Sequence, residues 1–348
     1  MFELKEYLGC LSAKRMPESA IVRAIPFEND EDSWMGITGD SYAVDTLGKI
    51  KTSKAYRRLG GKTQVLTNNV NAHVHDRLTH TNDVVNVAVF ISSVLGLNVD
   101  LCQAIASGHD IGHAPFGHLG EQFISEKTGK KFSHAKFGVI VSQYAERHGD
   151  GLNLTRQTKE GIMYHSGQVK QNMFPEAKVT AYSDKISFTL ADYNDIFQRT
   201  RILDIGNYPQ LKKLIELCGT KQRERLNFFI KGLCKESAEK GDVCFETSKE
   251  AILFKEIKEN MYKVYNCVNM LNDYVFLENT YALLAHHKNL IDGVDPAIVL
   301  ALMTDDDVFY LNKGGCINGE DFYKCSVAEI VGYLKGKEID FENPDLDR

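Results

Sequence analysis

The chain has 348 residues, of which 43% are hydrophobic and 25% are charged. These fractions are close to the averages of soluble globular proteins and exclude a disordered chain, a collagen-like repeat and a disulfide scaffold. The 41 Lys and Arg residues against 47 Asp and Glu residues give a net charge of −6, which does not favour binding of nucleic acid or anionic lipid by the whole surface.

The cysteines and the apolar stretches indicate the compartment. The eight cysteines lie at least nine residues apart and form no C-x-x-C motif, so neither a zinc ribbon nor a redox pair is expected. The first residues, MFELKEYLGC, lack the pattern of a secretory signal. The most apolar stretch, 84–99, is too short and too polar to span a bilayer. We therefore expect reduced thiols, no membrane contact and a cytoplasmic location.

Helical patterns follow one another along the chain. Apolar residues from Val84 to Leu95 recur at spacings of three and four and stop at Gly96, and Asn98 is placed to cap a second helix that ends at Gly108. Further helices are predicted at 181–197, 207–235, 249–276 and 296–312. Strand patterns are sparse. The predicted fold class is therefore mostly α, with few or no strands.

Histidine is concentrated in one part of the chain. Eight of the eleven histidines fall between His73 and His148. Because histidine titrates near neutral pH and is the commonest metal ligand, this crowding indicates a functional site.

Four residues on three predicted helices could form a metal site: His80, the adjacent pair His109 and Asp110, and Asp184. Imidazole nitrogen and carboxylate oxygen together suit one divalent cation such as Mn²⁺, Mg²⁺, Co²⁺, Fe²⁺ or Zn²⁺. A site whose ligands come from separate helices is typical of helical bundles.

These residues lie within longer motifs that resemble a known family. The segments RLTHT (77–81), GHDIGHAPFGHLGE (108–121) and YSDKISFTLAD (182–192) resemble the HD-domain superfamily. Three more segments, SKAYRRLGGKTQV (53–65), GLNLTRQTKEGIMYHS (151–166) and ALMTDDD (301–307), are similar to its deoxynucleotide triphosphohydrolase branch, which includes bacterial dGTPases.

The resemblance covers most of residues 45–312 and implies an HD-domain helical bundle with additional C-terminal helices. We expect a single mostly helical domain over 1–348, with an HD catalytic core at 45–215 and a C-terminal helical part at 216–312. Residues 336–348 are expected to form a polar tail.

Residue by residue, the resemblance assigns His80, His109, Asp110 and Asp184 as metal ligands. It assigns His113 and His118 as active-site histidines, Glu121 as the acidic partner of His118, and His134 as a substrate-site histidine. His118 and Glu121 lie three residues apart on the predicted opening turn of a helix, so they share a face. A carboxylate in that position fixes the tautomer of an imidazole and raises its pKa, which suits a general acid.

The resemblance also assigns substrate contacts. Arg77 and Lys185 match residues that bind the phosphates, and Gln64 and Asp192 match residues that hold the deoxyribose 3′-hydroxyl. Phe188 stands where the family usually has tyrosine, so its ring can stack on the sugar without the phenolic hydrogen bond. Two further cations, Arg58 and Lys62, are expected to be solvated surface charges.

The function that these motifs imply is the metal-dependent hydrolysis of a 2′-deoxynucleoside 5′-triphosphate to the deoxynucleoside and inorganic triphosphate, with dGTP favoured. One alternative is a 5′-nucleotidase or phosphodiesterase of the wider superfamily. Another is a non-catalytic regulator that binds nucleotide or nucleic acid. The resemblance implies a homo-oligomer, often a hexamer in this family.

One basic stretch bears on the binding alternative. Residues 219–240 contain Lys221, Arg223, Arg225, Lys231, Lys235 and Lys240. We interpret this stretch as a solvated helix face in preference to a surface for nucleic acid or a neighbouring subunit.

Overall fold

The computed structural model describes residues 4–35, 39–67, 71–265, 267, 271–313 and 319–348. In this part of the chain there are fifteen α-helices and no strand, and the one isolated β-bridge joins Thr63 to Asp76. The predicted mostly α class is confirmed. The α-helices are α1 (Tyr42–Val44), α2 (Lys54–Arg58), α3 (Arg77–Leu95), α4 (Val99–Gly108), α5 (His118–Thr128), α6 (His134–Tyr144), α7 (Arg156–Tyr164), α8 (Pro175–Asn194), α9 (Pro209–Cys218), α10 (Gln222–Lys240), α11 (Lys249–Tyr265), α12 (Leu271–His286), α13 (Pro296–Leu302), α14 (Asp305–Asn312) and α15 (Gly319–Phe322).

Short 3₁₀ and π segments connect these helices. The π segments are η6 (Asp45–Ile50) and η9 (Asp195–Arg199). The 3₁₀ segments are η1 (Leu4–Tyr7), η2 (Ser12–Lys14), η3 (Glu18–Ala20), η4 (Phe27–Asn29), η5 (Ser33–Met35), η7 (Leu59–Gly61), η8 (Arg147–Gly149), η10 (Ile205–Asn207), η11 (Ser326–Glu329) and η12 (Val331–Leu334).

Helix α3 ends at Gly96 and α4 begins after Asn98, as the sequence indicated, while α3 begins earlier than the apolar pattern from Val84. Asp76 caps α3 by accepting a hydrogen bond from the Thr79 amide at 2.7 Å, and Gly96 ends the helix in the left-handed conformation at φ 78°. Asn98 then caps α4 through the Leu101 amide at 3.0 Å. The chain therefore turns back within four residues, and α3 and α4 pack against each other.

Each of the three long helices expected after residue 200 is two shorter ones. Gly219, at φ 132°, separates α9 from α10. Met303 ends α13 in an extended conformation, and Thr304 caps α14 through the Asp307 amide at 3.0 Å. The expected helix at 249–276 comprises α11 and the start of α12. When a helix is interrupted but both halves bury the same face, the apolar spacing continues across the interruption. The sequence pattern then predicts one helix where there are two.

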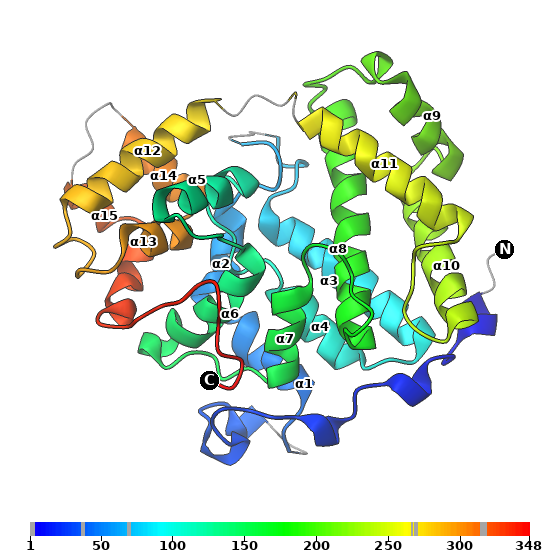
Figure 1. The fold of residues 1–348 in the computed structure, drawn as a ribbon, viewed down its shortest axis with the longest axis horizontal. Helices are drawn as coiled ribbons and strands as arrows, with labels where there is room; N and C mark the ends of the chain where they lie inside the picture. The colour runs from blue at the N-terminus through cyan, green and yellow to red at the C-terminus, as the bar shows by residue number, and fades with distance from the viewer. Residues whose placement is uncertain (1–3, 36–38, 68–70, 266, 268–270, 314–318) are drawn as a thin grey trace.

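The helices enclose two main hydrophobic cores (Figure 1). One core lies among α3, α4 and α8 with α9, α10 and α11 beside them. The other lies among α5, α6 and α7 with α12, α13 and α14. In Figure 1 the two groups occupy opposite sides of the molecule, and they meet where α7 of the second group packs on α4 and α8 of the first.

Residues 336–348 pack on the body of the protein. Phe341 is buried, with its ring 5.6 Å from that of Phe132. The Gln143 amide donates to the Arg348 carbonyl at 3.1 Å, and the Arg348 guanidinium lies 4.0 Å from the centre of the Tyr144 ring. The polar tail thus runs along α6.

The basic stretch 219–240 forms α10 and the turn before it. Arg225 is buried there and donates to Asn194 at 3.2 Å and to the Thr220 carbonyl at 2.9 Å. Glu236 and Glu239 lie on the same helix. Arg225 therefore has a structural role and adds nothing to a basic surface. Among the described residues, no helix is long and apolar enough to cross a membrane.

Candidate active site

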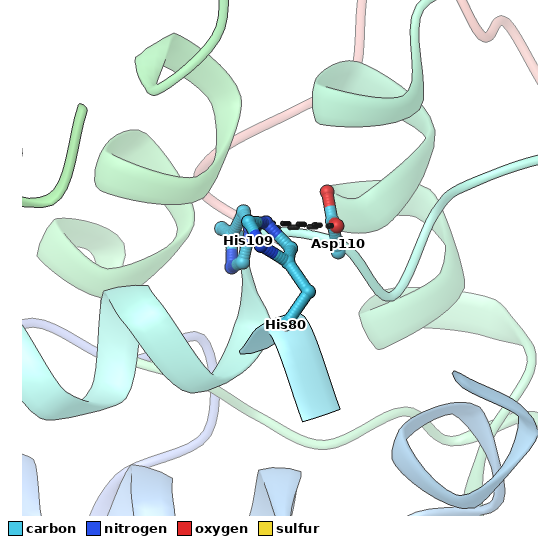
Figure 2. Close-up of side chains that lie close together, drawn as sticks. All are labelled: His80, His109 and Asp110. Carbon is cyan, nitrogen blue, oxygen red and sulfur yellow. Dashed lines mark ion pairs between the residues drawn. The ribbon is translucent and has the colours of Figure 1, made fainter. Parts of the chain in front are cut away.

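Three helices bring the four expected metal ligands together. His80 lies on the first turn of α3, His109 and Asp110 follow the last residue of α4, and Asp184 lies at the middle of α8. His80 Nε2 is 3.1 Å from Asp184 Oδ1 and 3.8 Å from Asp110 Oδ2. His109 Nε2 is 3.4 Å from Asp110 Oδ2 and 3.7 Å from Asp184 Oδ1. Figure 2 shows His80, His109 and Asp110 converging on one point.

The backbone fixes the tautomer of His109. Its Nδ1–H donates to the Ala106 carbonyl at 2.7 Å, so Nε2 carries the lone pair. That Nε2 is buried and has no hydrogen-bond partner among the described residues. A buried nitrogen without a partner is unfavourable in the bare protein and is explained if a ligand occupies the point it faces.

The protonation states also suit a cation. Burial would raise the pKa of Asp110, but His109, His113 and Arg77 hold it well below its usual range. Burial lowers the pKa of His109 and keeps its imidazole neutral, as a metal ligand must be. His80, His109 and Asp110 lie close enough to share an ion, and Asp184 Oδ1 lies within 3.7 Å of both imidazoles, so the four residues form a donor set that fits one divalent cation.

A second group of histidines lies beside this cluster. The rings of His113 and His134 are stacked with centroids 3.8 Å apart, and His113 Nε2 lies 3.3 Å from Asp110 Oδ1. His134 Nδ1 donates to Glu121 Oε1 at 2.5 Å. Glu121 thus hydrogen-bonds to His134, whereas the sequence led us to expect His118 as its partner. The reason is that His134, at the start of α6, projects toward the first turn of α5, while His118 is exposed at the outer end of that turn.

His165 completes this group, and sequence reasoning missed it. His165 follows α7 and is buried, and its Nδ1–H donates to the Ile162 carbonyl at 2.7 Å. Its Nε2 therefore accepts, and His134 Nε2–H donates to it at 3.1 Å. The signal was present in the segment 151–166, which ends in His165-Ser166, but nothing in the sequence shows that this histidine faces His134.

These contacts decide between two possible metal positions. Asp110, His113 and His134 also lie close enough to share an ion. Both nitrogens of His134 are already hydrogen-bonded, however, to Glu121 and to His165. The cluster of His80, His109, Asp110 and Asp184 is therefore the better candidate for a metal.

Comparisons with known proteins agree with this geometry. The HD domain family matches residues 77–189, a span that includes all four clustered residues.

Several similar proteins carry a common name. The chain is 38% identical over 216 residues to a "deoxyguanosinetriphosphate triphosphohydrolase-like protein" of Caldanaerobacter subterraneus subsp. tengcongensis, covering 62% of this chain and 60% of the relative. It is 34% identical over 224 residues to a protein of the same name from Clostridium tetani, covering 62% and 63%. A third, from Desulfatibacillum aliphaticivorans, is 29% identical over 310 residues, covering 84% and 82%.

The expected resemblance to the HD-domain deoxynucleotide triphosphohydrolases is thus confirmed. The matches to the first two relatives span only about three fifths of those proteins' length.

Two cationic side chains lie beside the cluster of His80, His109, Asp110 and Asp184, which we call the metal cluster. Arg77 Nη1 donates to Asp110 Oδ2 at 2.9 Å, and Arg77 Nε is buried without a partner among the described residues. Gly117 lies against this guanidinium: at φ 58°, a Cβ there would come within 2.8 Å of Arg77 Nη2. Lys185 donates to the Ala181 carbonyl at 3.0 Å and to the His165 carbonyl at 3.3 Å, and burial lowers its pKa to about 8. Arg77 thus adjoins the cluster directly, while the Lys185 ammonium is held on backbone carbonyls.

The prediction that Arg58 and Lys62 are solvated surface charges is wrong. Their exposed fractions are 6% and 3%. Lys62 donates to the carbonyl of His113, and burial, with Arg58 nearby, lowers the pKa of Lys62 to about 7. The segment 59–62 therefore packs beneath the loop that contains His113, and Lys62 is hydrogen-bonded to the backbone of that loop.

The three residues expected to contact the sugar form no hydrogen bond with the four clustered residues in the described part of the chain. Asp192 is buried two turns along α8 from Asp184, and burial raises its pKa to about 7. Phe188 lies between them and is half-buried. Gln64 is half-buried in the segment before α3, and its Oε1 has no hydrogen-bond partner among the described residues. No hydrogen bond joins these three residues to one another in the described chain.

Proposed function

We propose that this protein hydrolyses a 2′-deoxynucleoside 5′-triphosphate, with dGTP favoured, to the deoxynucleoside and inorganic triphosphate in a reaction that depends on one divalent metal ion. The observation that carries the proposal is the buried, unpartnered Nε2 of His109 in a cluster where each imidazole Nε2 of His80 and His109 lies 3.1 to 3.8 Å from an oxygen of Asp110 and of Asp184. The names of the relatives support the choice of substrate.

His80, His109, Asp110 and Asp184 would hold the cation. When bound, a divalent cation lowers the pKa of a water molecule and polarises a phosphoryl oxygen. The Asp110 carboxylate links the two groups of histidines, because Oδ2 faces His109 Nε2 and Oδ1 faces His113 Nε2. Mn²⁺, Mg²⁺, Co²⁺, Fe²⁺ and Zn²⁺ all accept this mixture of donors.

Arg77 is placed to bind the triphosphate. Its guanidinium is held beside Asp110, and its Nε–H has no partner among the described residues, so a phosphate oxygen can accept from it. In a site with little water, this fixed positive charge offsets the charge of the substrate more strongly than it would in solution.

His118 is our candidate for the general acid that protonates the departing 5′-oxygen. It is the exposed member of the group and has no hydrogen bond to a described residue, so both ring nitrogens are open to a substrate. Its surroundings lower the pKa of His118 through desolvation and through the positive His134 and Arg77. A bound triphosphate would oppose that shift, because negative charge favours the imidazolium.

The experiment that tests this function is a product assay with the four dNTPs and GTP in Mg²⁺, Mn²⁺ or Co²⁺. We expect deoxynucleoside and triphosphate from the wild type and none from Asp110→Ala. Asp100→Asn, on the first turn of the same helix α4, serves as the control and should retain wild-type turnover. His118→Ala should lower kcat by about 10² to 10⁴ while the metal stays bound.

Other products would point elsewhere. Monophosphate with pyrophosphate would mean a different scissile bond and would reject the role of His118. Hydrolysis of nucleoside monophosphates or cyclic nucleotides would favour the nucleotidase or phosphodiesterase alternative. Absence of turnover with every metal would favour a binding protein.

A further inference from the structure

A helix outside the matched HD domain contacts the substrate side of α8. Helix α11 packs its apolar face, including Phe254, Ile257 and Met261, into the core that it shares with α9 and α10. Its last residue, Tyr265, reaches α8, and its hydroxyl donates to Asp192 Oδ2 at 2.7 Å. Figure 1 shows α11 crossing α8 at the end where α8 stops.

The second oxygen of the same carboxylate has no hydrogen-bond partner in the part of the chain that the structure describes. Asp192 Oδ1 is buried, and no described residue hydrogen-bonds to it, while the whole residue is only 3% exposed. A buried carboxylate oxygen that accepts nothing is unfavourable and is rare in folded proteins. It indicates that a donor from outside the chain occupies this position when the site is filled.

We propose that Tyr265 is a positioning residue that sets recognition of a sugar hydroxyl through Asp192. This inference rests on the proposed function, and it concerns the sugar of the substrate. A phenol has one proton to donate, and Tyr265 donates it to Oδ2. The carboxylate cannot rotate without losing that bond, so Oδ1 is held as the acceptor for a hydroxyl of the substrate. The acceptor is thus supplied by α8 and its orientation by α11.

Kinetics of Tyr265→Phe test the proposal, because the variant removes one oxygen and keeps the ring. We expect KM for dGTP to rise at least tenfold, with kcat within about twofold of the wild type. The preference for dGTP over 2′,3′-dideoxy-GTP should largely disappear in the variant. The control is Tyr274→Phe, because Tyr274 also donates to a carboxylate, Glu126 Oε2 at 2.9 Å, on the far side of the protein. It should leave KM and the preference unchanged.

Calorimetric binding of dGTP and 2′,3′-dideoxy-GTP in EDTA separates this inference from the proposed function. If the wild type turns over dGTP and Tyr265→Phe keeps its KM and its preference, the role of Tyr265 is rejected and the function stands. If the wild type does not turn over but binds dGTP more tightly than the dideoxy analogue, and Tyr265→Phe removes that difference, the role of Tyr265 stands and the function is rejected. If the wild type neither turns over nor binds dGTP, both are rejected.

A double-mutant cycle excludes a purely structural effect. Asp192→Asn removes the charged acceptor, so Tyr265→Phe should change KM much less in that background than alone. Equal effects of Tyr265→Phe in both backgrounds would mean that the tyrosine acts through general stability, and the inference would fail. The cycle also covers misfolding, since a folding defect of Tyr265→Phe would persist in the Asp192→Asn background.

Discussion

Backbone carbonyls determine what two of the buried histidines can do. His109 and His165 each donate Nδ1–H to a carbonyl three residues earlier, at 2.7 Å in both cases. Each therefore presents a bare Nε2: that of His109 to the metal cluster, and that of His165 to His134. The helix ends thus select the tautomer before any ligand is bound, which lowers the cost of organising the site.

His75 provides a pH-dependent test at the scale of single residues. Its ring lies 2.9 Å from Asp195 and 3.2 Å from Asp83, and hydrogen bonds to these carboxylates raise the pKa of His75 to about 9. A raised histidine pKa stabilises the fold fully below the unfolded value of about 6.5, and this stabilisation is lost as the pH rises through 9.

We therefore expect the wild type to exceed His75→Gln in free energy of unfolding by on the order of 1–3 kcal/mol at pH 6. Urea denaturation across the range measures the difference, which should shrink steadily between pH 6.5 and 9. A difference that stays constant over this range would show that the charge of His75 contributes nothing. His287→Gln, at an exposed histidine, should show no such trend.

At the scale of elements, Gly112 allows α6 to approach the loop that follows α4. A Cβ at Gly112 would lie 2.1 Å from the Gly138 amide nitrogen and 2.3 Å from the His134 carbonyl oxygen. Both atoms are backbone, so the helix itself would have to move. Because His134 begins α6, this close approach is what stacks its ring on His113.

Gly112→Ala should accordingly lower the melting temperature by more than about 5 °C, or prevent folding, since overpacking against backbone costs about 1–3 kcal/mol or more. Gly60→Ala is the matched control, because its added Cβ would meet nothing closer than a Leu78 methyl at 3.7 Å. Thermal unfolding followed by circular dichroism compares the two. Equal melting temperatures would contradict the close packing of α6.

The elements themselves could be predicted better than their contacts. A capping residue such as Asn98 acts within one turn, so the sequence reveals where α4 begins. The metal cluster could be grouped because its residues belong to motifs of a known family. The bond from Tyr265 to Asp192 joins residues 73 positions apart, and no local pattern encodes such a pair.

Burial was the property that sequence reasoning judged least well. Lys62 and Arg58 are charged residues of the kind usually found on the surface. They are buried because the loop that contains His113 folds over them. Glu121 likewise pairs with His134, since distance in space decides its partner and spacing along α5 does not.

For the whole molecule, the metal cluster predicts a stability that depends on divalent cations. An ion that binds only the folded protein stabilises it by about 2.7 kcal/mol at a hundred times its Kd. We expect EDTA to lower the melting temperature by several degrees and added Mn²⁺ to restore it. Asp110→Ala should melt at the same temperature with and without the chelator, and a shift in that variant would place the ion elsewhere.

Helix α8 fixes the distance between Asp184 and Asp192. Asp184 and Asp192 are eight residues apart, and an α-helix rises about 1.5 Å per residue, so their backbones are separated by roughly 12 Å. If a nucleotide is held by its phosphate at the metal and by its sugar hydroxyl at Asp192, the helix sets the distance between these two points of attachment. One residue inserted between them would turn Asp192 by about 100° around the axis and away from Tyr265. The protein would then select ligands by the distance between their phosphate and their sugar hydroxyl, because one rigid helix fixes that distance without any contact with the base.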